Sequence, residues 1–181
     1  MSILDSLEHI LKETSRLNTG SGSLDLREKD RGAALQRVTV KGIDRDVLLI
    51  QNKARGSICQ DLKDCDGIQR RCDYVLACAD DDGLRLIFVE LKSENPNLEH
   101  ITTQFKGTEC FLDYCDAVLK RFYGVGMPPD CRRHYVVFHK ARPLEKTPTQ
   151  FPHVQQASTA ERPHLQFYEK PLRLRQLIAL S

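Results

Sequence analysis

Two short apolar runs joined by an acidic turn constrain this chain more than any other feature of its sequence. The runs cover residues 72–78 and 84–92, and the segment between them reads Ala-Asp-Asp-Asp-Gly. Runs rich in Val, Ile, Leu and aromatic residues on both sides of an Asp-Gly turn are typical of a β-hairpin. The sequence therefore predicts two antiparallel strands that close around residues 79–83.

Charged residues lie within this hairpin, where turn chemistry does not explain them. Asp73 stands near the start of the first strand, and Glu90 and Lys92 stand at the end of the second. Burying an ionised carboxylate among apolar side chains costs several kcal/mol unless a cation or hydrogen bonds compensate it. The acids in this hairpin therefore require partners.

Strand geometry is expected to bring these residues together. Residues two apart on a strand point to the same face, so Glu90 and Lys92 lie side by side while Leu91 points to the opposite face. Closure of the hairpin brings residues 72–74 opposite residues 88–92, and Asp73 then comes within reach of Glu90. Mg²⁺ is commonly held by one or two carboxylates with water and substrate phosphate. The pattern therefore predicts a divalent-metal site, beside which Lys92 would stabilise an attacked phosphate or orient water.

An Asp followed seventeen residues later by Glu-Leu-Lys resembles the motif of the PD-(D/E)xK, or restriction-endonuclease-like, nuclease superfamily. Cys72 stands where the family name has Pro. The resemblance implies that the chain hydrolyses phosphodiester bonds of nucleic acid, with DNA favoured over RNA, in defence, restriction or repair. It also implies that Asp73, Glu90 and the backbone carbonyl of Leu91 bind Mg²⁺ or Mn²⁺, while Lys92 activates or positions the attacking water.

The order of the expected elements agrees with this resemblance. The sequence predicts a helix over residues 2–17, a strand or hairpin over 35–51, the hairpin over 72–92, a helix over about 97–122, and strands at 135–138 and 165–168. Ser2 and Asp5 have the spacing of a capping box at the start of the first helix. The α-β-β-β-α-β order is the core order of the restriction-endonuclease-like fold. We therefore expect one α/β domain over residues 1–181, with a mixed central sheet flanked by helices.

The helix over residues 97–122 supplies a fourth candidate catalytic residue, Gln104. Apolar positions recur along this helix in alternating steps of three and four, and Gln104 lies one position off that stripe. Nuclease relatives often have a helix Gln that touches the site, and the Tyr that accompanies it in some branches corresponds here to Thr108. A surface glutamine is the simpler interpretation. Glu13, on the first helix, is a weaker candidate for approaching the metal.

Two alternatives stay open at this stage. Asp73, Glu90 and Lys92 can be a salt-bridged strand pair on a solvated sheet face, since strand ends often carry charges. The chain can also be a catalytically inactive nuclease-like module that binds nucleic acid or a protein partner, although all three charged positions are retained. If the chain is a nuclease, we expect a homo-oligomer or a larger protein partner to contribute to target choice.

Composition argues against several other classes of protein. No apolar run approaches the ~20 residues needed to span a bilayer, and the N-terminal sequence is unlike a signal peptide, so we expect a cytoplasmic protein with no membrane partner. Seven Cys without a Cys-x-x-Cys pair are expected to be reduced thiols. There is no phosphate-binding Gly-rich loop and no dinucleotide fingerprint. The cofactor that the family resemblance implies is Mg²⁺ or Mn²⁺.

Overall fold

The computed structural model describes residues 2–12, 14–17, 22–28, 33–51, 67–80, 83–93, 96–140 and 158–179. The elements within these ranges are α1 (Ile3–Ile10), β1 (Thr14–Leu17), β2 (Ser23–Arg27), β3 (Arg37–Lys41), β4 (Asp46–Gln51), β5 (Tyr74–Asp80), β6 (Gly83–Lys92), α2 (Leu98–Tyr123), β7 (Arg132–His139), β8 (His164–Phe167), β9 (Leu172–Arg173) and α3 (Leu174–Ala179). Among them, no helix has both the length and the apolar character needed to cross a membrane.

Six strands form the main sheet, in the order β1-β4-β5-β6-β7-β8. Pairing is antiparallel from β1 to β6 and parallel from β6 to β8. Parallel neighbours need a long crossover connection, and the 26-residue helix α2 provides it between β6 and β7. The expected mixed α/β architecture is thus confirmed at this level.

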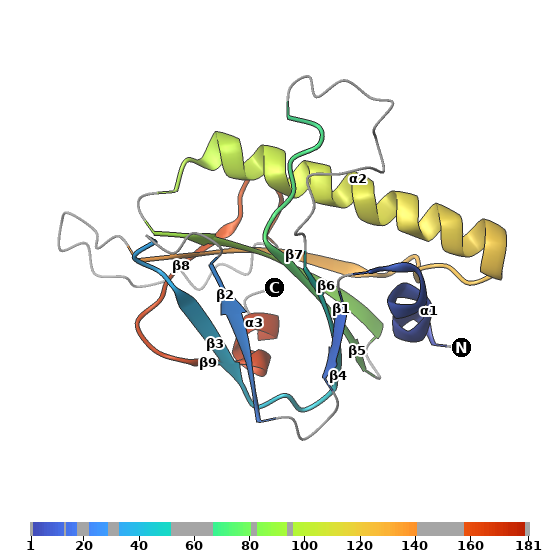
Figure 1. The fold of residues 1–181 in the computed structure, drawn as a ribbon, viewed down its shortest axis with the longest axis horizontal. Coiled ribbons are helices and arrows are strands. Elements are labelled where there is room, and N and C mark those ends of the chain that lie inside the picture. Colours follow the sequence, from blue (N-terminus) through green and yellow to red (C-terminus); the bar gives the residue numbers. More distant parts are fainter. Residues whose placement is uncertain are drawn as a thin grey trace.

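Both faces of the main sheet are covered (Figure 1). Helices α1 and α2 pack on one face, over Leu48, Val75, Leu86, Phe88 and Val137 among others. The second face packs against α3 and a small sheet of order β2-β3-β9, in which β3 and β9 are parallel. Because both faces are buried, the central strands β5 and β6 are almost continuously apolar instead of alternating with polar residues.

The first helix is shorter than the sequence predicted. The capping box of Ser2 and Asp5 is confirmed, but α1 ends at Ile10 and Leu11 takes an extended conformation. Residues 14–17, which were expected to continue the helix, form β1 against β4. Thr and Ser are poorer helix formers than Ala or Leu, and the pairing with β4 gives this segment's backbone its hydrogen-bond partners.

The segment over residues 35–51 contains two strands, and they do not form a hairpin with each other. β3 pairs with β2 and β9 in the small sheet, whereas β4 pairs with β1 and β5 in the main sheet. The turn-like residues Gly42 to Asp44 therefore carry the chain from one sheet to the other. β2, which the sequence reading did not predict, alternates buried and more exposed residues as a strand covered on one face should.

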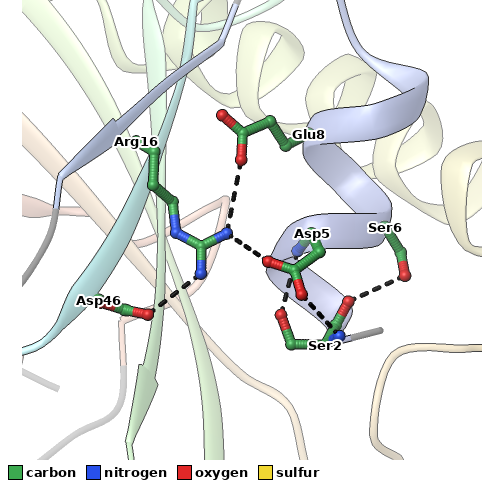
Figure 2. Close-up of polar contacts among 6 residues, drawn as sticks. All are labelled: Ser2, Asp5, Ser6, Glu8, Arg16 and Asp46. Carbon is green, nitrogen blue, oxygen red and sulfur yellow. Dashed lines mark hydrogen bonds and ion pairs between the residues drawn. The ribbon is translucent and has the colours of Figure 1, made fainter.

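Arg16 on β1 joins three elements at the edge of the main sheet (Figure 2). Its Nη1 lies 2.9 Å from Asp5 Oδ1 and 3.5 Å from Glu8 Oε2, both on α1. Its Nη2 lies 3.1 Å from Asp46 Oδ2 on β4. The backbone N–H and hydroxyl of Ser2, followed by Arg16, lower the pKa of Asp5 to about 2. One guanidinium therefore ties α1 to β1 and β4.

Replacing Arg16 with Met should lower the melting temperature by a few degrees, because the attachment of α1 loses all three ion pairs while the apolar stem is kept. The matched control is Arg37→Met, since Arg37 is 59% exposed and makes one long ion pair, with Asp25. Scanning calorimetry of both variants provides the measurement. Equal melting temperatures for the two variants would contradict this account of Arg16.

His134 on β7 is a buried polar residue without compensation from the described residues. Its side chain lies on the second face of the main sheet, the face covered by α3 and the small sheet. The residue is 5% exposed, and neither ring nitrogen has a hydrogen-bond partner within the described part of the chain. Burial, together with the positive charges of Arg85 and Arg132, lowers the pKa of His134 to about 4. The folded protein therefore holds His134 neutral, while the unfolded chain protonates it near pH 6.5.

This difference predicts acid-sensitive stability. At His134 the unfolded state binds more protons between pH 6.5 and 4, so the contribution of His134 to the free energy of unfolding should fall by roughly 2–3 kcal/mol as the pH drops through that window. His134→Leu should flatten this part of the curve, whereas His9→Leu, which removes an exposed histidine of α1, should leave it in place. Urea unfolding at a series of pH values measures both effects. An unchanged acid limb in His134→Leu would show that another group causes it.

Candidate active site

The hairpin formed by β5 and β6 places the predicted acids opposite each other. Tyr74 pairs with Val89, and the register continues to Asp80 opposite Gly83. Asp73 lies in a bend immediately before β5, so it comes next to Glu90. The predicted antiparallel hairpin and its alignment are confirmed.

Two hydrogen bonds of opposite direction join Asp73 to the end of β6. The backbone N–H of Asp73 donates to Glu90 Oε2 at 3.1 Å, and the backbone N–H of Leu91 donates to Asp73 Oδ2 at 2.9 Å. Leu91 thus takes part in the site through its N–H, while its side chain is buried in the second layer. The carboxylate of Glu90 is thus held by the backbone just before β5, and that of Asp73 by the backbone of β6.

Lys92 and Gln104 complete the cluster around Glu90. Lys92 Nζ lies 2.5 Å from Glu90 Oε1, and Gln104 Nε2 donates to the same oxygen at 2.8 Å. Glu90 and Lys92 share the face covered by α2, as strand periodicity predicted, and Gln104 reaches them from that helix. All four candidate catalytic residues therefore meet in one place, whereas Glu13 lies outside the described residues.

Glu90 carries the strongest electrostatic perturbation in this cluster. Its side chain is only 1% exposed, whereas that of Lys92 is 31% exposed. Burial, followed by the negative charge of Asp73, raises the pKa of Glu90 to about 7, and Lys92 and Gln104 oppose the rise. A second carboxylate beside a buried one disfavours ionisation of both, which is the charge arrangement that a bound cation would relieve.

The segment over residues 67–73, here termed the connector, leads into β5 and lies against α2. Gln104 Nε2 also donates to the carbonyl of Arg71 at 3.3 Å, and the N–H of Cys72 donates to Thr108 Oγ1 at 2.9 Å. The Arg71 guanidinium lies 4.1 Å from the centroid of the Phe111 ring. The sequence reading did not predict these contacts, because the connector has no periodicity that would indicate its path.

The thiol of Cys72 is adjacent to Asp73 but is suited to packing, not to chemistry. The residue is completely buried, and its thiol donates to the carbonyl of Tyr74 at 3.3 Å. Burial raises the pKa of Cys72 well above its usual range, so the nucleophilic thiolate is disfavoured. No disulfide bond joins the cysteines within the described residues, in agreement with the expected reduced thiols: Cys72, Cys78, Cys110, Cys115 and Cys131. Cys59 and Cys65 lie outside these residues.

The donor set can be compared with what different metals require. No group of three or more His, Cys, Asp and Glu side chains that could hold a metal occurs among the residues described. A zinc site made of protein ligands alone needs three or four such groups. Two carboxylates instead suit Mg²⁺ or Mn²⁺, which retain water and take further oxygens from a substrate phosphate. Gln104 Oε1, a buried oxygen that accepts no hydrogen bond from the described residues, adds an uncommitted acceptor.

The raised pKa of Glu90 predicts how stability should depend on pH in a chelating buffer. The folded state holds the Glu90 proton more tightly than the unfolded chain, so the associated stabilisation is complete below about pH 4.5 and is lost as the pH rises through about 7. Glu90→Gln should remove this decline, which amounts to no more than about 3 kcal/mol.

Urea unfolding between pH 4.5 and 8.5 in EDTA provides the measurement. Glu99→Gln, a substitution of an exposed acid in the first turn of α2, should keep the wild-type decline. If the curves for wild type and Glu90→Gln run parallel, Glu90 is ionised throughout this pH range, and the conclusion that its pKa is raised is wrong.

Comparisons of the chain with protein-family models, with curated proteins and with solved structures found no match.

Proposed function

We propose that this chain is a divalent-metal-dependent nuclease of the PD-(D/E)xK type. The observation that carries the proposal is the convergence of Asp73, Glu90, Lys92 and Gln104 from the connector, β6 and α2. A salt-bridged strand pair on a solvated face would leave Glu90 accessible to water, but its side chain is 1% exposed. Burying Glu90 beside the partly buried Asp73 costs free energy that a purely structural arrangement would not require.

The order of elements supports the same proposal. Helix α1, strands β4, β5 and β6, helix α2 and strand β7 follow one another in the α-β-β-β-α-β order of the restriction-endonuclease-like fold. Strands β1, β2 and β3 are additions between α1 and β4. The candidate site lies where β5 begins and β6 ends, next to the crossover helix.

Each residue of the cluster would have a separate task. Asp73 and Glu90, with the backbone carbonyl of Leu91, would hold Mg²⁺ or Mn²⁺. The bound metal would supply Lewis-acid activation of the phosphodiester and of the attacking water. Lys92 pairs with the buried Glu90 but is itself partly exposed, so its ammonium can approach a phosphate oxygen or the water. Gln104 fixes the carboxylate of Glu90 by donating to Oε1.

A non-catalytic nuclease-like module is the second candidate, and one observation favours it. Within the protein itself, Glu90 accepts from Lys92 and Gln104 at one oxygen and from the N–H of Asp73 at the other. A carboxylate that is already bonded in this way can be held without a metal. In that case the chain would bind nucleic acid or a protein partner without cutting.

Cleavage of plasmid DNA, DNA oligonucleotides and RNA oligonucleotides tests the first proposal. Wild type should cut in Mg²⁺ or Mn²⁺ and not in EDTA, and we favour DNA over RNA as substrate. Asp73→Asn and Lys92→Met should each reduce the rate roughly 100-fold or more, because they remove a metal ligand and the charge that activates water. Circular dichroism and thermal unfolding check that both variants fold.

Two matched substitutions control for loss of charge elsewhere. Asp25→Asn removes a half-buried acid on β2, and Lys120→Met removes an exposed ammonium near the end of α2. Both should retain the wild-type rate. Nucleic-acid binding without cutting by wild type would favour the non-catalytic module. Cutting that survives in Asp73→Asn and Lys92→Met would overturn the assignment of this site.

Light scattering of the wild type, alone and with substrate, tests the proposed homo-oligomer.

A further inference from the structure

At Gly107, the backbone of the connector lies so close to α2 that no side chain would fit between them. Gly107 is the buried glycine in the middle of α2. A Cβ placed on Gly107 would lie 1.9 Å from the carbonyl oxygen of Arg70 and 3.2 Å from that of Ile68. Both oxygens belong to backbone, which cannot rotate away as the end of a long side chain can. The backbone of the connector therefore rests directly on the helix.

The occurrence of glycine at this position requires a reason, because glycine inside a helix is less stable than alanine. Alanine would improve the helix but would force the connector away from it. The contact with Arg70 supplies the reason for glycine. Gly67, at the start of the connector, has a positive φ of 71°, and its carbonyl accepts the N–H of Arg70. This turn directs the following residues along α2.

Contacts further along α2 continue the same attachment toward the site. Thr108 Oγ1 accepts the N–H of Cys72 at 2.9 Å and donates to the carbonyl of Gln104 at 2.8 Å. Gln104 in turn donates to both the carbonyl of Arg71 and Glu90. The backbone is therefore fixed on α2 up to the residue that precedes Asp73.

We propose that Gly107 is a positioning residue: the missing side chain lets the connector lie on α2, and this sets Asp73 opposite Glu90. Its catalytic consequence rests on the proposed function, since Asp73 is a metal ligand only if the chain is a nuclease. The placement of Asp73 itself does not depend on that function. Displacement of the connector would break the hydrogen bond between the Leu91 N–H and Asp73 and that between the Asp73 N–H and Glu90.

The decisive variant is Gly107→Ala, with Cys110→Ala on the exposed side of the same helix as control. Amide hydrogen exchange by NMR should become at least tenfold faster at Asp73 and Leu91 in Gly107→Ala and stay unchanged at Phe88, in the middle of β6. A general loss of stability would accelerate all three amides together. The Cys110→Ala control should exchange as wild type does.

A second substitution tests the same attachment without a steric clash. Thr108→Val removes the oxygen that accepts from the Cys72 N–H and should accelerate the same two amides, while Thr108→Ser should restore the wild-type rates. This pair decides the question if Gly107→Ala does not fold. The proposal is overturned if exchange at Asp73 and Leu91 is unchanged in Gly107→Ala. If Gly107→Ala does not fold, unchanged exchange of these two amides in Thr108→Val overturns it instead.

Cleavage kinetics separate the positioning role from the proposed function. If wild type cuts nucleic acid, Gly107→Ala should lower kcat at least tenfold with KM little changed, because the substrate-binding surface is kept while Asp73 is displaced. Wild-type kcat in Gly107→Ala would overturn the catalytic part. If wild type does not cut, the proposed nuclease activity fails, and the exchange rates still decide whether Gly107 positions Asp73.

Discussion

The buried carboxylate of Glu90 is the constraint on which the rest of this structure depends. An ionised acid removed from water needs hydrogen-bond donors or a cation. Lys92 supplies an ammonium from the same strand, Asp73 supplies an N–H from the end of the connector, and Gln104 supplies an amide from the covering helix. The hairpin, the connector and α2 are therefore held in a common arrangement by their interactions with one side chain.

Much of this cluster follows from local rules of geometry. The period of two along a strand places Glu90 beside Lys92, and an antiparallel hairpin with a short acidic turn brings Asp73 to Glu90. The regular apolar stripe of α2 defines the orientation of the helix, and Gln104, one position off the stripe, points toward the strand ends. These predictions succeed because each depends on residues close in sequence or on one strong periodic pattern.

The parts that sequence reasoning missed depend on pairing between distant segments. Leu11 and Leu17 have a spacing that fits a helix, but residues 14–17 gain more from pairing with β4 as a strand. β3 and β4 look like a hairpin because they are adjacent, yet each finds its partners elsewhere. Gly107 gave one readable signal, a glycine within a strongly periodic helix, but its partner in the connector could not be inferred from that signal alone.

The parallel pairing of β3 with β9 joins Val40 to Leu172, and the hydroxyl oxygen of Tyr168 accepts a hydrogen bond from the N–H of Thr39. These contacts join segments that are far apart in the sequence. The chain must therefore lose the conformational entropy of a long loop before the contacts can stabilise the fold. On a ribosome, the hairpin, the connector and α2 would emerge after β2 and β3 but before β9 and α3, which complete the cover of the second face of the sheet. The candidate site would thus be assembled on a sheet whose second face is only partly covered, and β9 and α3 would complete that cover last.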